Sequence, residues 1–366
     1  MFSETAYKNA DACRFCWMCR HLCPVALVTG KEINSARAKG LMVSMIKRGE
    51  EYDASMAEDM WECCLCGSCA NNCATGYDPR LFIREARSLA VAEGLAPKKV
   101  AALAEAMLPE GLMYGGQALP ESLEKRLAGL PERAETLLLI GQVARHETPE
   151  LALAAMELLD RAGADWTALA AEPDSGAYLG DMIGYVDETR KLAGALGKAI
   201  DGSGAKTVIV LDPMDARMLK HKCTEWNCAP KAEVFTATSY FAALTASGAL
   251  RPEKTGGVCA IHDSGALSRD LGETAPVRAL AAALGLEIHE LLRSGELSKS
   301  SGGALLPKYA GELSLALAKA RWDELLRRDA RLLVTEAPGS YAALRQCVPE
   351  GCELEDILTL LAGACR

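Results

Sequence analysis

Apolar and polar positions alternate with a helical period over most of the first hundred residues. In residues 33–62, apolar side chains recur three and four positions apart between charged ones, and two helices fit there. Residues 81–99 show the same spacing and should form a helix that ends near Gly94 and Pro97, because both residue types are typical of helix ends. The N-terminal part is therefore predicted to be helical.

The pattern changes in the second half of the chain. Short apolar runs alternate there with helical stretches, which is typical of parallel sheets covered by helices. The first run starts in ETLLLIGQVA and a later one in GGVCAIHD, while the segment before them is broken by Pro and Gly. We therefore expect an α+β multidomain chain with a helical domain 1–97, a helical linker 98–133, a first α/β module 134–255 and a second α/β module 256–366.

Two segments of the second half have the same organisation. Residues 207–220 (TVIVLDPMDARMLK) and 331–345 (RLLVTEAPGSYAALR) each contain a strand, a turn with proline and a helix. A polar loop lies upstream of each at a similar distance, at residues 172–185 and 298–307. This internal similarity predicts that the two α/β modules are repeats of one unit.

Composition and charge exclude several classes of protein. The net charge of -9 is spread along the 366 residues without a Lys/Arg cluster, so nucleic acid is not expected as a partner. No apolar run reaches the roughly 18 to 20 residues that span a bilayer, and the first residues lack the pattern of an export signal. We expect a cytoplasmic protein that reaches a membrane only through its partners.

The fifteen cysteines change the picture, because a chain without an export signal uses cysteine for metal ligation more often than for disulfides. Nine lie between residues 13 and 73, and eight of these form two copies of the spacing Cys-x2-Cys-x2-Cys-x3-Cys. This spacing ligates cubane clusters in bacterial two-cluster ferredoxins, whereas zinc sites seldom use it twice. The copies are Cys13, Cys16, Cys19, Cys23 and Cys63, Cys66, Cys69, Cys73.

In paired motifs of this kind, the fourth cysteine of each ligates the cluster of the other. We therefore predict two 4Fe-4S clusters, the first held by Cys13, Cys16, Cys19 and Cys73 and the second by Cys63, Cys66, Cys69 and Cys23. Cys64 is out of register and is expected to be a spare buried thiol. Trp17 and Trp61 flank the motifs and should shield the clusters from water.

The remaining cysteines lie outside the motifs and show no repeating pattern. We expect them to be buried single thiols, with a third metal site of Cys223, Cys228 and His221 as the weaker alternative. The six are Cys223, Cys228, Cys259, Cys347, Cys352 and Cys365.

In its first hundred residues the chain resembles the iron–sulfur subunits of glycolate oxidase, anaerobic glycerol-3-phosphate dehydrogenase and heterodisulfide reductase. CRFCWMCRHLCP, NSARAKGL and CCLCGSCANNCATGYDPRLFIREARSLAVAEGLAP follow that family in order and spacing, with Ala74 where many such motifs have proline. The resemblance implies a helical ferredoxin followed by two cysteine-rich α/β modules, each with a Cys-Cys-Gly loop and a Pro-x-Cys loop.

Here the modules lack those cysteines. Asp174-Ser175-Gly176 and Ser300-Ser301-Gly302 stand at the Cys-Cys-Gly positions, and Pro213-Met214-Asp215 and Pro338-Gly339-Ser340 stand at the Pro-x-Cys positions. His262-Asp263-Ser264-Gly265 stands where the family often has His-Asp-Pro-Cys. Because a serine hydroxyl is far less acidic than a thiol, these loops should hold no additional cluster. His262 is expected to be a structural histidine.

Cubane clusters with four cysteine ligands pass single electrons and have no open iron position for a substrate. The sequence therefore predicts a non-catalytic electron-transfer subunit, and no nucleotide, hydrolase or zinc-protease motif competes with this. The resemblance implies a flavin-containing dehydrogenase as partner, acting on a 2-hydroxy acid or on glycerol 3-phosphate, with a further electron carrier or a quinone-linked component. The alternatives are a catalytic subunit like that of heterodisulfide reductase and a docking scaffold in an electron-bifurcating complex.

Overall fold

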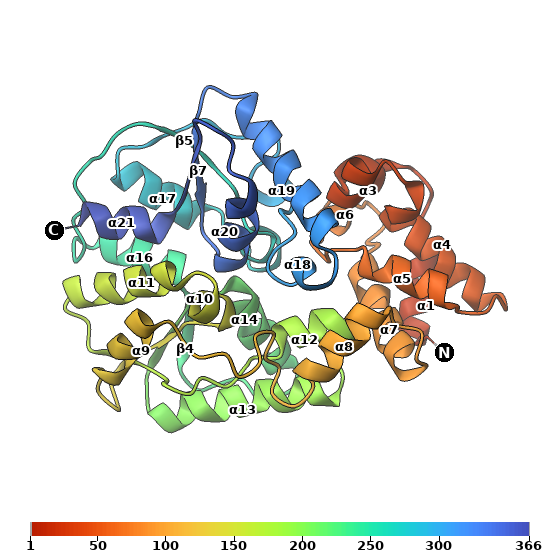
Figure 1. Ribbon diagram of the computed structural model, residues 1–366, viewed down its shortest axis with the longest axis horizontal. Coiled ribbons are helices and arrows are strands. Elements are labelled where there is room, and N and C mark those ends of the chain that lie inside the picture. Colours follow the sequence, from red (N-terminus) through yellow and green to blue (C-terminus); the bar gives the residue numbers. More distant parts are fainter. Residues whose placement is uncertain (1, 366) are drawn as a thin grey trace.

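The computed structural model describes residues 2–365. Helices of the N-terminal part lie beside a larger part that contains two small parallel sheets (Figure 1). The chain therefore has the mixed α and β character that its pattern predicts.

The N-terminal part is built from short helices, and side-chain caps fix where several of them begin. Ser35 Oγ accepts from Ala38 N at 3.2 Å and Asp53 Oδ1 from Met56 N at 2.8 Å, so α4 and α5 start where the sequence offers an N-cap. These are the two helices expected in residues 33–62. The elements are α1 (Glu4–Asp11), α2 (Met18–Leu22), α3 (Pro24–Thr29), a 3-10 turn (Glu32–Asn34), α4 (Ala36–Lys47), α5 (Ala54–Trp61), α6 (Ser68–Asn71) and α7 (Pro79–Ala92).

The predicted linker consists of α8 (Lys98–Met107) and α9 (Glu121–Ala128). Helix α8 buries Val100, Ala104 and Met107 against the rest of the molecule, where it contacts α12 and α18. Helix α8 is thus packed against the α/β part, and α9 packs on α11 (Pro149–Arg161).

Each sheet has four parallel strands, and each follows the same order relative to its own first strand. The orders are β2-β1-β3-β4 and β6-β5-β7-β8. The central strands are buried on both faces, which is why they read as continuous apolar runs. The strands are β1 (Thr136–Leu139), β2 (Trp166–Ala168), β3 (Thr207–Val210), β4 (Glu233–Thr236), β5 (Val258–Ile261), β6 (Glu287–Ile288), β7 (Leu332–Thr335) and β8 (Glu353–Asp356).

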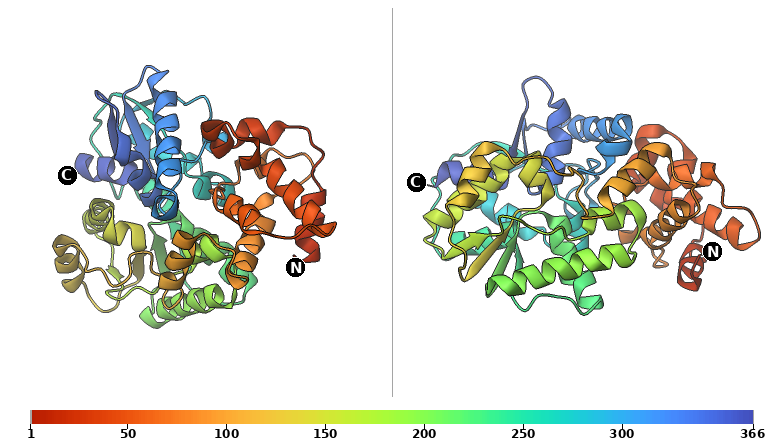
Figure 2. Two further views of the ribbon diagram at one scale, coloured as in Figure 1. Left: turned by 45° about the vertical axis from the view of Figure 1, so that its right-hand side comes forward. Right: turned by 60° about the horizontal axis from the view of Figure 1, so that its bottom comes forward.

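The helices around the sheets join the two α/β modules into one body. Helix α11 packs on α21 and α16 packs on α17, so a single hydrophobic core reaches from Leu123 to Cys365 (Figures 1 and 2). The helices are α10 (Gln142–His146), α11 (Pro149–Arg161), α12 (Ala177–Ile183), α13 (Asp187–Ser203), α14 (Pro213–Arg217), α15 (Cys223–Glu225), α16 (Ala237–Ala246), α17 (Ala275–Ala283), α18 (Leu306–Tyr309), α19 (Gly311–Leu326), α20 (Pro338–Leu344) and α21 (Ile357–Ala364). Two π-helical turns (Met218–Lys222, Ala266–Asp270) and two 3-10 turns (Gly295–Leu297, Arg345–Cys347) complete the set in residues 2–365.

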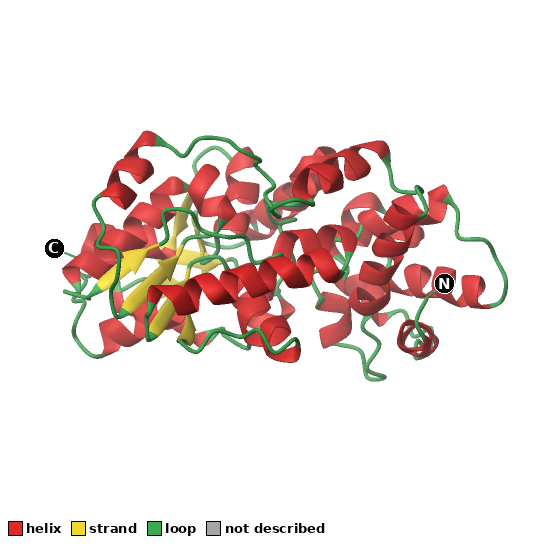
Figure 3. Cartoon of the chain, turned by 90° about the horizontal axis from the view of Figure 1, so that it is seen from below, coloured by secondary structure: helices red, strands yellow, loops and turns green. Residues whose placement is uncertain are grey.

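The N-terminal helices dock onto the α/β part through Trp61. This side chain is 2% exposed, and its Nε1 donates to Met182 O at 3.0 Å, while Tyr309 Oη donates to Trp61 O at 3.2 Å. One apolar cluster continues from the N-terminal helices into α12 and Leu305. Seen from below, the strands lie at one end of the molecule and the N-terminal helices at the other (Figure 3). The second cysteine motif, directly after Trp61, therefore lies at the junction.

Within residues 2–365, the structure contains no helix with the length and apolar character needed to cross a membrane.

Candidate metal centre

The two cysteine motifs fold into loops of the same shape. Phe15 and Leu65 occupy equivalent positions with φ of 53° and 51°, and Trp17 and Gly67 follow with φ of 66° and 75°. These are left-handed conformations that cost a non-glycine residue about 1–2 kcal/mol. Because the two loops share this unusual backbone conformation, the cysteines within them are expected to have the same function.

In both loops a backbone N–H points at a sulfur. Phe15 N lies 3.5 Å from Cys13 Sγ, and Leu65 N lies 3.4 Å from Cys63 Sγ. Such N–H groups stabilise the negative charge that a thiolate acquires when it ligates iron. The loops therefore fit the cluster type that the spacing predicts.

The four cysteines predicted to hold the second cluster lie together. Cys63, Cys66 and Cys69 from the second motif gather with Cys23 from the first around one enclosed cavity, which Cys64 also lines. Cys23 reaches this place because α3 starts directly after it, and its Sγ also accepts from Ala26 N at 3.5 Å. The fold thus brings the fourth cysteine of the first motif to the second.

The cysteines of the first motif are more open. Cys19 is close enough to Cys13 and Cys16 for their charges to interact, and Cys16 is exposed. Cys73 follows α6, which packs on α2, and its sulfur lies 3.2 Å from Thr75 Oγ1. Across residues 2–365, no three His, Cys, Asp or Glu side chains already stand as a metal-ligand set. The assignment of all eight ligands therefore remains the prediction made from the spacing.

Burial shifts the pKa values of the second set of thiols. It raises the pKa of Cys23 to about 12 and also raises those of Cys63 and Cys69. In contrast, the pKa of Cys66 falls to about 5, because the Cys64 thiol donates a hydrogen bond to it and Arg269 lies nearby. Cluster binding must release the protons of the raised thiols, so it is favoured at higher pH.

Three buried or half-buried cations surround the second motif and were not predicted from the sequence. Arg87 donates to the backbone carbonyls of Met60 and Cys63, and Arg269 Nε donates to Cys66 O at 2.8 Å. Lys39, 1% exposed, donates to the carbonyl of Asp59. Positive charge beside a cluster stabilises its reduced form, which is more negative. Arg87 lies on the apolar face of a helix predicted from the sequence, and this position could have indicated a buried cation.

The first motif lies at the surface instead. Phe15, Trp17 and Met18 are 50%, 44% and 56% exposed. The Arg37 guanidinium lies 3.5 Å from the centre of the Trp17 ring. Trp61 is buried, whereas Trp17 is partly exposed, and the shielding of the clusters by the two tryptophans stays a prediction.

Comparison with known proteins agrees with this geometry. Residues 9–77 match the family described as "4Fe-4S dicluster domain". The chain is an iron–sulfur protein with an electron-transfer role. It contains a 4Fe-4S domain at its N-terminus, and the α/β part follows outside the matched residues.

Three curated proteins are similar over almost the whole chain. A probable membrane-anchored ferredoxin of Chromohalobacter salexigens is 25% identical over 99% of this chain and 61% of its own length. An EtfAB:quinone oxidoreductase of Syntrophomonas wolfei is 25% identical over 90% of this chain and 54% of its own length. A subunit of the dihydromethanophenazine:CoB–CoM heterodisulfide reductase of Methanosarcina acetivorans is 23% identical over 97% of this chain and 93% of its own length. This chain thus spans less than two thirds of the first two relatives.

A solved structure shows the same fold. The crystal structure of a hypothetical protein from Helicobacter pylori superposes with a TM-score of 0.57 at 11% identity, covering 99% of this chain and 73% of the other. The fold of the whole chain therefore occurs in an experimental structure.

The cysteine-depleted loops of the first module form a hydrogen-bonded polar network. Ser175 Oγ donates to Asp215 Oδ1 at 2.5 Å, which joins the loop at the Cys-Cys-Gly position to the loop at the Pro-x-Cys position. Tyr178 Oη donates to Asp212 Oδ2 at 2.7 Å, and Gln142 Nε2 donates to Asp174. These side chains satisfy one another, as buried polar groups must.

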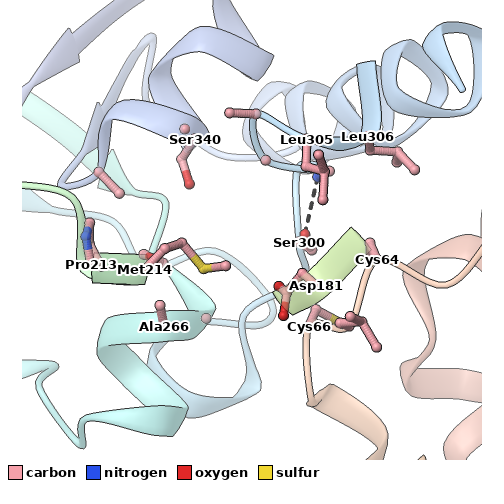
Figure 4. Close-up of a pocket in the computed structure, with 18 of the residues that line it drawn as sticks. Cys64, Cys66, Asp181, Pro213, Met214, Ala266, Ser300, Leu305, Leu306 and Ser340 are labelled. Atoms are coloured by element: carbon pink, nitrogen blue, oxygen red, sulfur yellow. Dashed lines mark hydrogen bonds between the residues drawn. The ribbon is translucent and has the colours of Figure 1, made fainter. Parts of the chain in front are cut away.

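The corresponding loops of the second module line a cavity of about 110 Å³ next to the second cysteine motif. Figure 4 shows Cys64 and Cys66 on one side of this cavity and Pro213, Met214 and Ser340 on the other. The second cysteine motif thus directly adjoins the α/β part.

The weaker candidate for a third metal site is not assembled. His221 Nε2 lies 3.0 Å from Asp270 O, while Cys223 is buried and interacts with Cys228. His262 is also buried, and its Nδ1 accepts from Arg321 Nε at 3.0 Å, as a structural histidine would.

Proposed function

We propose that this chain is a two-cluster electron-transfer subunit of a flavin-dependent dehydrogenase complex. In this function it relays single electrons between the flavin of a partner subunit and a further carrier or a quinone-linked component. The observation that supports the proposal most strongly is the gathering of Cys23 with Cys63, Cys66 and Cys69, because two-cluster ferredoxins exchange their fourth ligands in this way.

The surroundings of the two motifs support a division of roles. The first motif lies at the surface beside Phe15 and Trp17, where a partner can approach it. The second motif is enclosed by Arg87, Arg269 and Lys39, which favour the reduced state of a cluster there. We infer that the partner docks over the first motif and that the second cluster has the higher potential.

The α/β part supports a docking role. Its two sheets share one strand order, in keeping with the proposed repeat of one unit with boundaries near residues 134, 256 and 366. Its loops hold Asp215, Ser301 and Ser340 at three positions where the resemblance implies cysteine. We propose that these modules fix the 4Fe-4S domain in a larger complex and add no cluster of their own.

A catalytic function is the second candidate. The similarity to a heterodisulfide reductase component over 93% of that protein favours it. The loop residues argue against a heterodisulfide reaction at an extra cluster, because carboxylate and hydroxyl groups are poor ligands for iron–sulfur chemistry.

Ligand variants test the proposed pair of clusters. Cys23→Ser and Cys73→Ser should each reduce the iron content from about eight to about four atoms per chain, because each loses one cubane. Cys64→Ser is the matched control and should keep the wild-type iron content. Iron and acid-labile sulfide are measured on anaerobically purified protein. Wild-type iron content in the Cys23 variant would contradict the assignment.

A further inference from the structure

The cavity beside the second cysteine motif lies where the ends of two sheets meet. Its lining comes from the loops after β3, β5 and β7, from the loop before α18, and from residues 63–66. The carboxyl ends of parallel strands are the usual ligand-binding edge of an α/β sheet. A small ligand is therefore expected to bind at this position. Its volume of about 110 Å³ leaves room for several water molecules or a small organic ion.

Three serines with unbonded hydroxyls line this cavity. Ser264, Ser301 and Ser340 are 7%, 1% and 9% exposed, and they come from two loops and the first turn of α20. Within the described part of the chain, none of the three hydroxyls makes a hydrogen bond, although Ser300 Oγ beside them accepts from Gly302 N at 3.1 Å. Since all three residues line the cavity, these hydroxyls are available to a ligand inside it.

Two further donors lack an acceptor at this cavity. Arg269 donates through Nε to Cys66 O and through Nη1 to Ser298 O at 2.7 Å, but its buried Nη2 has no partner in residues 2–365. His262 accepts at Nδ1 from Arg321, which can only donate, so the neutral ring carries its proton on Nε2. Burial and Arg321 lower the pKa of His262, which keeps the ring neutral.

The carboxylates that line the cavity already have partners. Asp181 accepts from Arg84 and Arg217, and Asp270 accepts from Arg80 at 2.6 Å. A third lining carboxylate, Asp212, accepts from Tyr178 Oη at 2.7 Å and from Met214 N at 2.9 Å. The groups left free are therefore mainly donors, and one of them is charged.

We propose that this cavity binds a small anion, an oxyanion or a carboxylate, through Arg269 Nη2, the His262 Nε2–H group and the hydroxyls of Ser264, Ser301 and Ser340. An anion accepts from each of these groups without requiring a donor of its own. The α/β part then acts as the receptor for a small ligand that lies next to the electron-transfer site.

Arg269 connects the ligand to the second cluster. The same guanidinium donates to Cys66 O, belongs to a residue that lines the cavity, and has an unbonded Nη2. An anion bound there offsets the charge of Arg269, so it lowers the potential of the adjoining cluster, and reduction of that cluster weakens anion binding by the same factor. This part of the inference rests on the proposed function, whereas the binding site does not.

Calorimetry on the purified full-length chain tests the site, with sulfate, inorganic phosphate and succinate as probes at constant ionic strength. Binding of at least one probe is expected. Comparing sulfate and phosphate with succinate shows whether the site prefers an inorganic oxyanion or a carboxylate. Ser301→Ala, Ser340→Ala and Arg269→Gln should weaken this binding at least tenfold. The serine variants remove only unbonded hydroxyls, so they should fold as wild type does.

Exposed positions provide the matched controls. Ser247 and Arg327 are exposed and do not line the cavity, so Ser247→Ala and Arg327→Gln should bind the probe as wild type does. No binding of any probe by the wild type, or equal loss in the controls, would overturn the site.

Redox titration followed by EPR tests the link to the cluster. The bound probe should shift one of two potentials downward, and Arg269→Gln should abolish this shift. Probe binding without any shift would overturn the link. Iron analysis of the same sample separates the proposed function from the proposed anion site. A sample without iron contradicts the proposed function, whereas the binding isotherm of that sample still tests the anion site.

Discussion

Two loops with the same cysteine spacing differ in the residues at their left-handed positions. Trp17 in the first loop corresponds to Gly67 in the second, and their φ values are 66° and 75°. Trp17 turns outward and stacks on Arg37, whereas Gly67 leaves space for Arg80, which a Cβ would meet at 2.7 Å from Nη1. The first loop thus presents an aromatic surface, and the second is packed against the α/β part.

Gly67→Ala tests this packing at the residue scale. The new methyl group must displace the Arg80 guanidinium in addition to the backbone strain of about 1–2 kcal/mol. Gly76→Ala is the control, because Gly76 has a similar φ of 71° but no atom within 4 Å of its Cβ position. Denaturant unfolding should show a larger loss for the Gly67 variant. Equal losses would mean that Arg80 adapts without cost.

The ligand roles of the cysteines could be predicted from their spacing in the sequence. The side chains that surround them in the structure could not be predicted. The position of Cys23 follows from the motif itself, since the exchange of fourth ligands is a property of the spacing. Arg269 lies 203 residues from Cys66 and contacts it only because the π-helical turn Ala266–Asp270 folds back on the N-terminal part. A sequence pattern carries no information on a contact of this range.

At the scale of elements, the strand–turn–helix segments were predictable because their apolar runs and prolines are local signals. Strand β3 and helix α14, and strand β7 and helix α20, lie where the pattern places them. The hydrogen bonds made by the residues that stand in place of the loop cysteines were not predictable from the sequence. The Ser175–Asp215 bond depends on two loops that meet only at the end of the sheet.

The carboxyl of Asp174, in the loop before α12, predicts a pH dependence. Burial raises its pKa from 3.8 to about 7, so the folded chain binds this proton more tightly than the unfolded chain does. The stability that this group contributes is present at pH 4 and is lost as the pH rises toward 7, by up to about 1.4 kcal/mol per pH unit. Urea unfolding between pH 5 and 8 should show this decline.

Asp174→Asn removes the titrating group while keeping an oxygen for Gln142. The variant should lose less stability than wild type over the same pH range. An unchanged slope would mean that other buried carboxyls, such as Asp356, determine the decline, since burial raises the pKa of that group to about 7 as well.

At the scale of the whole molecule, a chain of ion pairs joins the 4Fe-4S domain to the α/β part. Arg80 pairs with Asp270 at 2.6 Å, Asp270 with Arg217 at 3.4 Å, Arg217 with Asp181 at 3.2 Å, and Asp181 with Arg84 at 2.9 Å. The apolar cluster around Trp61 lies in the same junction. The hydrophobic cores cross the domain boundaries that were predicted from the sequence. Small modules bury little apolar surface alone, so they pack against one another.

Asp270→Asn should weaken this junction. The change removes one of the carboxylate partners of Arg80 and of Arg217, which keep Asp78 and Asp181, so it should cost about 1.5–3 kcal/mol. Glu135→Gln is the control, since its ion pair with Lys206 is exposed and should contribute about 1 kcal/mol or less. Limited proteolysis and chemical unfolding compare the two variants. Equal stability of both would contradict a junction held by these charges.

The central claim is that this chain carries two 4Fe-4S clusters and passes electrons between them. The most direct measurement is anaerobic iron and sulfide quantitation together with EPR of the dithionite-reduced protein. A chain with two clusters should give about eight irons and the signal of two magnetically interacting cubanes. About four irons with the signal of an isolated cubane, or a signal unlike a cubane, would contradict it.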